Sequence, residues 1–158
     1  MGRRHTFMDR EFARDDYDPD DQGTFTENLV FVGMPFRSDM DEVFSTIRDA
    51  CSGLLLKAVR VDDGMVGSGF IIRDITTLIE TAEFVIIDLS HERPNVYYEL
   101  GYAHGVGNES EEILLIARDG TVVHFDSAPL RVRFYRSMEH LREIVTSNLR
   151  EMMRLTRR

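Results

Sequence analysis

The stretch that decides the fold is Phe84-Val85-Ile86-Ile87-Asp88-Leu89, followed after a short turn by Pro94-Asn95-Val96-Tyr97-Tyr98-Glu99-Leu100-Gly101-Tyr102-Ala103. The first run is apolar until Asp88, which is typical of a strand buried on both faces of a parallel sheet. In the second run, Pro94 disfavours helix at the residue before it and Asn95 is a good N-cap. We therefore predict a helix over 96–105 directly after a buried strand.

Strands and helices alternate along the rest of the chain. The patterns predict strands over 29–32, 55–61, 113–117 and 132–135, and helices over 40–51, 70–81 and 137–157, with Ser137 as the last N-cap. This alternation implies an α/β domain with a parallel sheet and helices on both faces. Five strands in the order 2-1-3-4-5 are the simplest assembly, and ligands of such sheets bind at the switch point between the first and third strands.

Length, charge and cysteine content exclude several classes of protein. With 158 residues, the chain is long enough for one sizeable core and short for two. Its 19 basic and 28 acidic residues give a net charge of −9, which argues against a nucleic acid polymer as partner. A single cysteine excludes an intrachain disulfide, and neither a membrane span nor a secretory signal is recognisable. We expect one domain, located in the cytoplasm, without a membrane partner.

Residues 1–27 form an acidic N-terminal segment without hydrophobic periodicity. Such a segment cannot bury enough apolar surface to become ordered alone, so we expect a flexible leader before an α/β domain over 28–158. The alternative is an arm that docks on a neighbouring subunit through its aromatic residues, which are Phe7, Phe12, Tyr17 and Phe25.

Glu99 and Asp88 are the candidate catalytic residues. We predict Glu99 in the first turn of its helix and Asp88 at the carboxyl end of its strand, so both should open into one crevice. The helix dipole should keep Glu99 ionised, which suits a nucleophile or an electrostatic stabiliser. Two carboxylates are the usual minimal apparatus for cleaving a glycosidic bond. The alternatives are a solvated helix residue for Glu99 and a structural cap for Asp88.

The segment Tyr98-Glu99-Leu100-Gly101-Tyr102-Ala103 resembles the Glu-Leu-Gly-Tyr-Ala segment of the nucleoside 2-deoxyribosyltransferase family, whose glutamate is the nucleophile. The resemblance implies that Glu99 attacks C1′ of a nucleoside or nucleotide. The same segment is also similar to TIR-like bacterial domains, where Asn-Val-x-x-Glu-Leu-Gly follows a hydrophobic strand that ends in Asp. Both families have a flavodoxin-like layout and act on N-glycosides. The similarity in order of elements runs from Asn28 to Tyr135.

Further substrate-binding residues are predicted around this segment. Gly33-Met34-Pro35-Phe36 follows the first strand; Gly33 allows close approach of a ligand, and Phe36 can stack on a base or, alternatively, pack in the core. The resemblance implies that Asp74 matches a third acidic position of the family, and that Arg93 matches a position contacting phosphate or sugar. Nucleotide-using relatives carry a small hydroxyl residue there, but arginine is compatible with phosphate. Asn95 completes the predicted set.

We therefore predict cleavage or transfer at the N-glycosidic bond of a nucleoside or nucleotide. The alternatives are a TIR-like NAD glycohydrolase and a non-catalytic nucleotide-sensing module. Neither a metal nor a cofactor is expected, because His91 and Cys51 lack partners at metal-ligand spacing. A homodimer or higher homo-oligomer is expected from Tyr98 and Tyr102, and from the habit of the deoxyribosyltransferases of completing their sites across subunits.

Overall fold

The computed structural model describes residues 26–61, 68–91, 93–123 and 131–157. Its centre is a five-stranded parallel sheet in the order β2-β1-β3-β4-β5. The strands are β1 (Thr26–Gly33), β2 (Lys57–Val59), β3 (Ala82–Asp88), β4 (Ile113–Arg118) and β5 (Val132–Tyr135). The predicted flavodoxin-like α/β fold and its strand order are confirmed.

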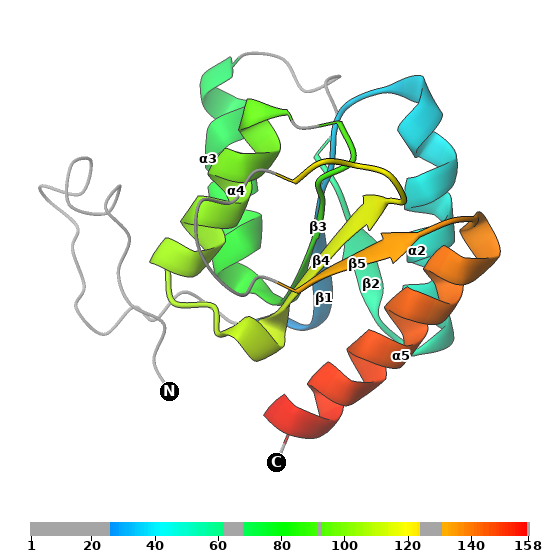
Figure 1. Cartoon of the computed structure of the whole chain (residues 1–158). Helices are drawn as coiled ribbons and strands as arrows, with labels where there is room; N and C mark the ends of the chain where they lie inside the picture. Colours follow the sequence, from blue (N-terminus) through cyan, green and yellow to red (C-terminus); the bar gives the residue numbers. More distant parts are fainter. Residues whose placement is uncertain (1–25, 62–67, 92, 124–130, 158) are drawn as a thin grey trace, which may run out of the picture.

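Two helices cover each face of the sheet. On one face lie α2 (Asp41–Gly53) and α5 (Met138–Thr156), and on the other lie α3 (Ser68–Thr81) and α4 (Pro94–Gly105) (Figure 1). Two short 3-10 helices, η1 (Ser38–Met40) and η2 (Ser110–Glu112), precede α2 and β4. The hydroxyl oxygen of Ser137 accepts a hydrogen bond from the His140 N–H, so the predicted N-cap of α5 is confirmed.

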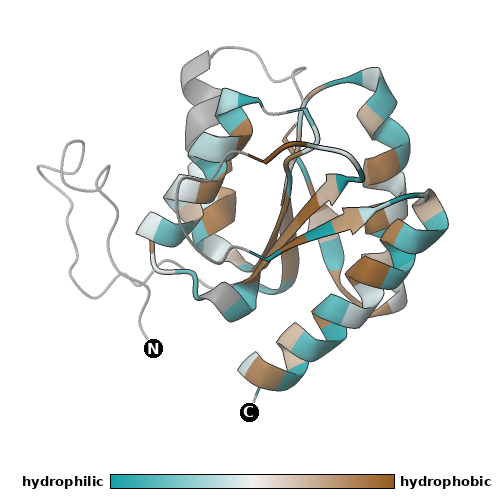
Figure 2. Ribbon diagram, in the orientation of Figure 1, coloured by the Kyte–Doolittle hydropathy of each residue, from teal (hydrophilic) through white to brown (hydrophobic). Residues whose placement is uncertain are grey.

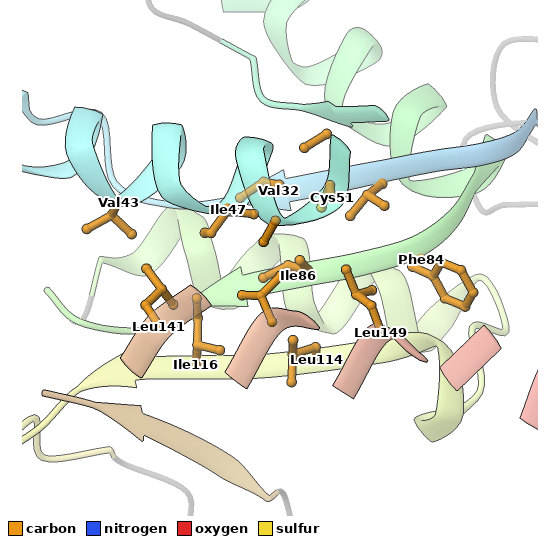
Figure 3. Packing of buried hydrophobic residues seen from close by; sticks show 14 of the residues in the cluster. Val32, Val43, Ile47, Cys51, Phe84, Ile86, Leu114, Ile116, Leu141 and Leu149 are labelled. Carbon is orange, nitrogen blue, oxygen red and sulfur yellow. The ribbon is translucent and has the colours of Figure 1, made fainter. Parts of the chain in front are cut away.

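Strand alternation divides the core into two layers. Every residue of β3 is buried, and its side chains point by turns to the two helix layers. Phe84 and Ile86 pack with Ile47 of α2 and Leu141 of α5 in what we call the α2/α5 core (Figure 3). Val85 and Ile87 belong to the α3/α4 core, with residues such as Leu100. The helices accordingly turn apolar faces inward and polar faces outward, and the strands are mostly hydrophobic (Figure 2).

Several element boundaries differ from the sequence predictions; the strand predicted over 55–61, for example, is confirmed only as Lys57–Val59. β1 begins at Thr26, within the predicted leader, and the remaining leader residues lie outside the described part of the chain. α4 begins at Pro94, and its N-cap is Arg93 rather than Asn95. Proline is favoured at the first helical position because the N–H that it lacks has no intrahelical acceptor there. The prediction of Asn95 as N-cap is therefore wrong, and Glu99 lies in the second turn of α4.

A charged clamp ties the end of α5 to the amino end of the sheet. The guanidinium of Arg157 donates to both carboxylate oxygens of Glu83, at 2.6 and 2.8 Å, and to Asn28 Oδ1 at 2.9 Å. The backbone N–H of Asn28, a residue with a left-handed φ of 64°, donates to the same carboxylate at 2.7 Å. Glu83 is buried, so this clamp satisfies a carboxylate at the start of β3.

Candidate functional site

Glu99 lies in a niche formed by a missing side chain. Glu99 is 5% exposed, and its Oε2 has no hydrogen-bond partner within the described residues. A Cβ added at Gly33, the last residue of β1, would collide with this Oε2 and would approach Ile87 Cδ1 to 2.7 Å. The absence of a side chain at Gly33 therefore makes the room for the carboxyl group of Glu99. The close approach predicted at Gly33 is made by a residue of the protein itself.

Burial decides the protonation of Glu99. Loss of contact with water raises the pKa of Glu99 from 4.5 to about 7, and within the described ranges no hydrogen bond or neighbouring cation offsets this effect. The prediction that the helix dipole keeps the group ionised is wrong, because Glu99 lies beyond the first turn of α4, where the dipole acts. Near neutral pH the carboxyl group is therefore about evenly divided between its acid and its carboxylate forms.

Asp88 lies on the opposite face of the sheet from Glu99. It follows Phe84 and Ile86 in the strand alternation, so it points to the α2/α5 core, whereas Ile87 points to Glu99. Its carboxylate accepts hydrogen bonds from the Ser90 N–H at 2.8 Å, from the Ser90 hydroxyl, and from the Tyr135 hydroxyl at 2.9 Å. Burial raises the pKa of Asp88, while these hydrogen bonds oppose the shift. The prediction of one crevice shared by both carboxylates is wrong.

The segment after β1 is divided between the two faces in the same way. Gly33 and Phe36 lie on the Glu99 side, where Phe36 is half-buried against the α3/α4 core. Met34 is buried in the α2/α5 core, and its sulfur lies 3.5 Å from Nη1 of Arg60. Pro35 is also buried. Phe36 thus packs partly in the core, as the alternative interpretation predicted. Met34 lies on the face of the sheet opposite Glu99, and Pro35 is buried within the fold.

The remaining predicted residues are not gathered around Glu99. Arg93 and Asn95 are both exposed at the start of α4. Asp74 belongs to α3, but its side chain lies outside the described part of the structure. Of the predicted site, the structure therefore brings together Glu99 and Gly33, with Phe36 on the same face.

A cluster of charged residues at the carboxyl ends of three strands escaped the sequence analysis. The side chain of Asp39, in η1, is contacted by Arg37 Nε at 2.9 Å, by His91 Nε2 at 2.9 Å and by Arg118 Nη1 at 3.2 Å. The hydrogen bond from Arg37 lowers the pKa of Asp39 to about 2, with a further contribution from His91, although desolvation opposes this shift. His91 and Arg118 are 52 and 79 residues away from Asp39, so only the strand order reveals their proximity.

A cavity lies beside this cluster. Its volume is about 340 Å³, and it is lined by Arg118, Asp119, Tyr135, Arg136, Ser137 and Met138. It lies where β4 and β5 end and α5 begins, at the carboxyl edge of the sheet where ligands of such folds bind.

Comparisons with known proteins add no family assignment. No protein-family model matches the chain, and a search of curated proteins found no match.

Among the described residues, no three or more His, Cys, Asp or Glu side chains are grouped so that they could hold a metal ion. No helix in the described ranges is long and apolar enough to cross a membrane.

Proposed function

We propose that this protein cleaves or transfers the N-glycosidic bond of a nucleoside or nucleotide, with Glu99 as the nucleophile. The observation that supports this most is the carboxyl group of Glu99, whose buried Oε2 has no hydrogen-bond partner among the described residues and lies against Gly33 at the carboxyl end of β1. Burying an unpaired carboxylate costs several kcal/mol, on the order of the shifts known for buried acids. Such a cost suits a group whose partner is the reacting centre of a substrate.

The chemistry follows from the charge of that centre. One oxygen of ionised Glu99 forms a bond to C1′ while the bond from C1′ to the base nitrogen breaks, and the electron pair of that bond leaves with the base. Water or an acceptor base then attacks C1′ and releases the carboxylate. Positive charge develops on the sugar in the transition state, so an anion held in a water-poor site stabilises this state more than the ground state. Turnover should therefore rise as pH increases through about 7, where Glu99 loses its proton.

The isolation of Asp88 favours a second candidate, an NAD glycohydrolase. Asp88 was predicted to contact the sugar or the base, where it could have protonated the departing base, but its carboxylate is engaged by Ser90 and Tyr135 on the other face of the sheet. Nicotinamide leaves a cationic N-glycoside as a neutral molecule and needs no proton from the protein. Among the residues that the structure describes, Glu99 is the one carboxylic acid in this niche, and such a site fits NAD without a further acid.

The experiment is chromatographic detection of free base and of nicotinamide from a panel of deoxynucleosides, their 5′-monophosphates and NAD. The variant Glu99→Gln keeps the shape of the side chain and removes the charge, so turnover should fall by a factor of about 100 or more. Glu143→Gln, at an exposed position of α5, is the matched control and should retain full turnover. Unchanged turnover in Glu99→Gln would exclude the mechanism. Binding of nucleotides without turnover of any substrate would instead support a sensing module.

We propose in addition that the protein is a homo-oligomer. Tyr98, next to Glu99 on α4, is 53% exposed, and its ring stacks on that of Tyr102 with the centroids 6.3 Å apart. Tyr102 is half-buried, so the ring of Tyr98 is the part of this pair that a partner can contact, and exposed aromatic rings are typical of protein interfaces. Mass photometry should give at least twice the mass of the chain, which is 18.3 kDa; a monomer at micromolar concentration would contradict this proposal.

A further inference from the structure

The cluster around Asp39 combines basic side chains from the carboxyl ends of three strands at one point. Arg37 follows β1, His91 follows β3, and Arg118 is the last residue of β4. In a chain with a net charge of −9, three basic side chains thus converge on a single carboxylate, at the carboxyl edge of the sheet. Parallel donors of this kind are the usual means by which proteins recognise phosphate and carboxylate groups.

Asp39 is an exchangeable occupant of this cluster. Its side chain is 38% exposed, so an anion from solvent can reach the cations without unfolding the core. The backbone of Asp39 is held independently, because Arg118 Nη2 donates to its carbonyl oxygen at 2.8 Å. The carboxylate can therefore rotate away while η1 remains attached to β4.

The neighbouring cavity supplies space and a further cation. Arg118 belongs to the cluster and also lines the cavity of about 340 Å³, and Arg136 is a second arginine in the cavity lining. Arg37 and Arg118 form ion pairs with Asp39. The guanidinium of Arg136 forms no ion pair with any residue in the described part of the chain. Asp119 is the acidic residue in the cavity lining, so two guanidinium groups face one carboxylate there.

We propose that Arg37, His91, Arg118 and Arg136 form a binding site for a phosphate group, and that Asp39 occupies this site as an internal competitor. As a second step, which rests on the proposed function, the substrate of Glu99 is a nucleotide whose phosphate displaces Asp39. The two sites share the segment after β1: Gly33 carries the Glu99 niche, and Arg37 lies four residues later, at most about 14 Å along an extended chain.

The first experiment measures the affinity for inorganic phosphate by calorimetric titration at constant ionic strength. Asp39→Asn removes the competing charge and should tighten phosphate binding roughly tenfold, because a charge-assisted hydrogen bond typically contributes a factor of this order. Arg118→Gln should weaken binding by a similar factor, and Arg37→Gln serves if the Arg118 variant fails to fold. Arg154→Gln is the matched control, since this exposed arginine pairs with Glu151 near the end of α5.

If Asp39 only stabilised the fold, Asp39→Asn would not tighten phosphate binding. If Asp39→Asn leaves phosphate affinity unchanged or weakens it, the competitor model is wrong. If Arg118→Gln and Arg154→Gln lose affinity equally, the interaction is a general surface effect and the site is refuted. Thermal denaturation of each variant shows whether an altered affinity merely reflects partial unfolding.

The second experiment tests the nucleotide step. A deoxynucleoside 5′-monophosphate should bind at least roughly tenfold more tightly than either the matching nucleoside or inorganic phosphate, since one molecule then engages both sites. Equal affinity for the nucleotide and inorganic phosphate would overturn this step. Phosphate binding does not involve Glu99, so Glu99→Gln should retain it. Loss of the proposed glycosidic chemistry would thus be seen as lost turnover with phosphate binding retained, whereas failure of the anion site would be seen in the binding of inorganic phosphate itself.

Discussion

Replacing Glu99 by glutamine should stabilise the protein at high pH while it abolishes turnover. The carboxyl group of Glu99 is buried, and its pKa rises from 4.5 to about 7 on folding. A carboxylic acid whose pKa is raised by folding does not reduce the stability of the fold as long as it is protonated. Its ionisation is then more favourable in the unfolded chain, so the fold loses stability as pH rises from about 4.5 to about 7.

The size of this effect follows from the pKa. At about 1.4 kcal/mol per pH unit, the difference between 4.5 and about 7 corresponds to a penalty of about 3 kcal/mol at pH 8. Below pH 4.5 the penalty is absent, because Glu99 is protonated in both states. Glutamine carries no charge at either pH. The difference in the free energy of unfolding between Glu99→Gln and wild type should therefore be about 3 kcal/mol more favourable to the variant at pH 8 than at pH 4.

Urea denaturation of both proteins at pH 4 and pH 8 measures this double difference. Contributions from other groups, such as Asp88, are common to both proteins and cancel. Glu143→Gln, at its exposed position on α5, provides the control and should change stability by the same small amount at both pH values. An equal effect of Glu99→Gln at pH 4 and pH 8 would refute the inference that burial shifts the ionisation of this residue.

Three further substitutions probe the packing around the site, each with urea denaturation as the measurement. Gly33→Ala should destabilise the fold by about 1–3 kcal/mol, because the added Cβ collides with Glu99 and Ile87; a neutral effect would contradict the niche. Tyr135→Phe should cost about 1–3 kcal/mol, since buried Asp88 loses a hydrogen bond. Arg157→Ala should cost about 1–3 kcal/mol by leaving buried Glu83 without its guanidinium, and a loss below about 0.5 kcal/mol would show that the clamp is weak.

The sheet could be predicted because its signals are local. The apolar run around Ile86 and the capping residue Ser137 specify a buried strand and the start of α5 without reference to distant residues. The helix that carries Glu99 was predicted with its start two residues late. Asn95 and Pro94 are both strong start signals, and the proline determined the first helical position.

The site was predicted less well because side-chain direction depends on register. Asp88 and Glu99 both lie near the carboxyl edge, yet one residue of strand alternation sends Asp88 to Tyr135 and Ile87 to Glu99. Likewise, the contacts of Asp39 join residues from three loops, and no spacing in the sequence marks them. Chain order predicts which strand ends meet, but it does not predict which side chains face each other there.

The two charged features at this edge are complementary in a way that bears on the proposed chemistry. Glu99 has no cation beside it in the part of the chain that the structure describes, and its burial makes ionisation unfavourable until positive charge develops there. The Asp39 cluster is a set of basic side chains around a carboxylate that is 38% exposed and that, in our proposal, a phosphate group displaces. A nucleotide that becomes cationic at C1′ and carries an anionic phosphate would supply both missing partners in one molecule. Binding of the phosphate would then help to hold C1′ against Glu99, so removal of the phosphate should lower turnover as well as affinity.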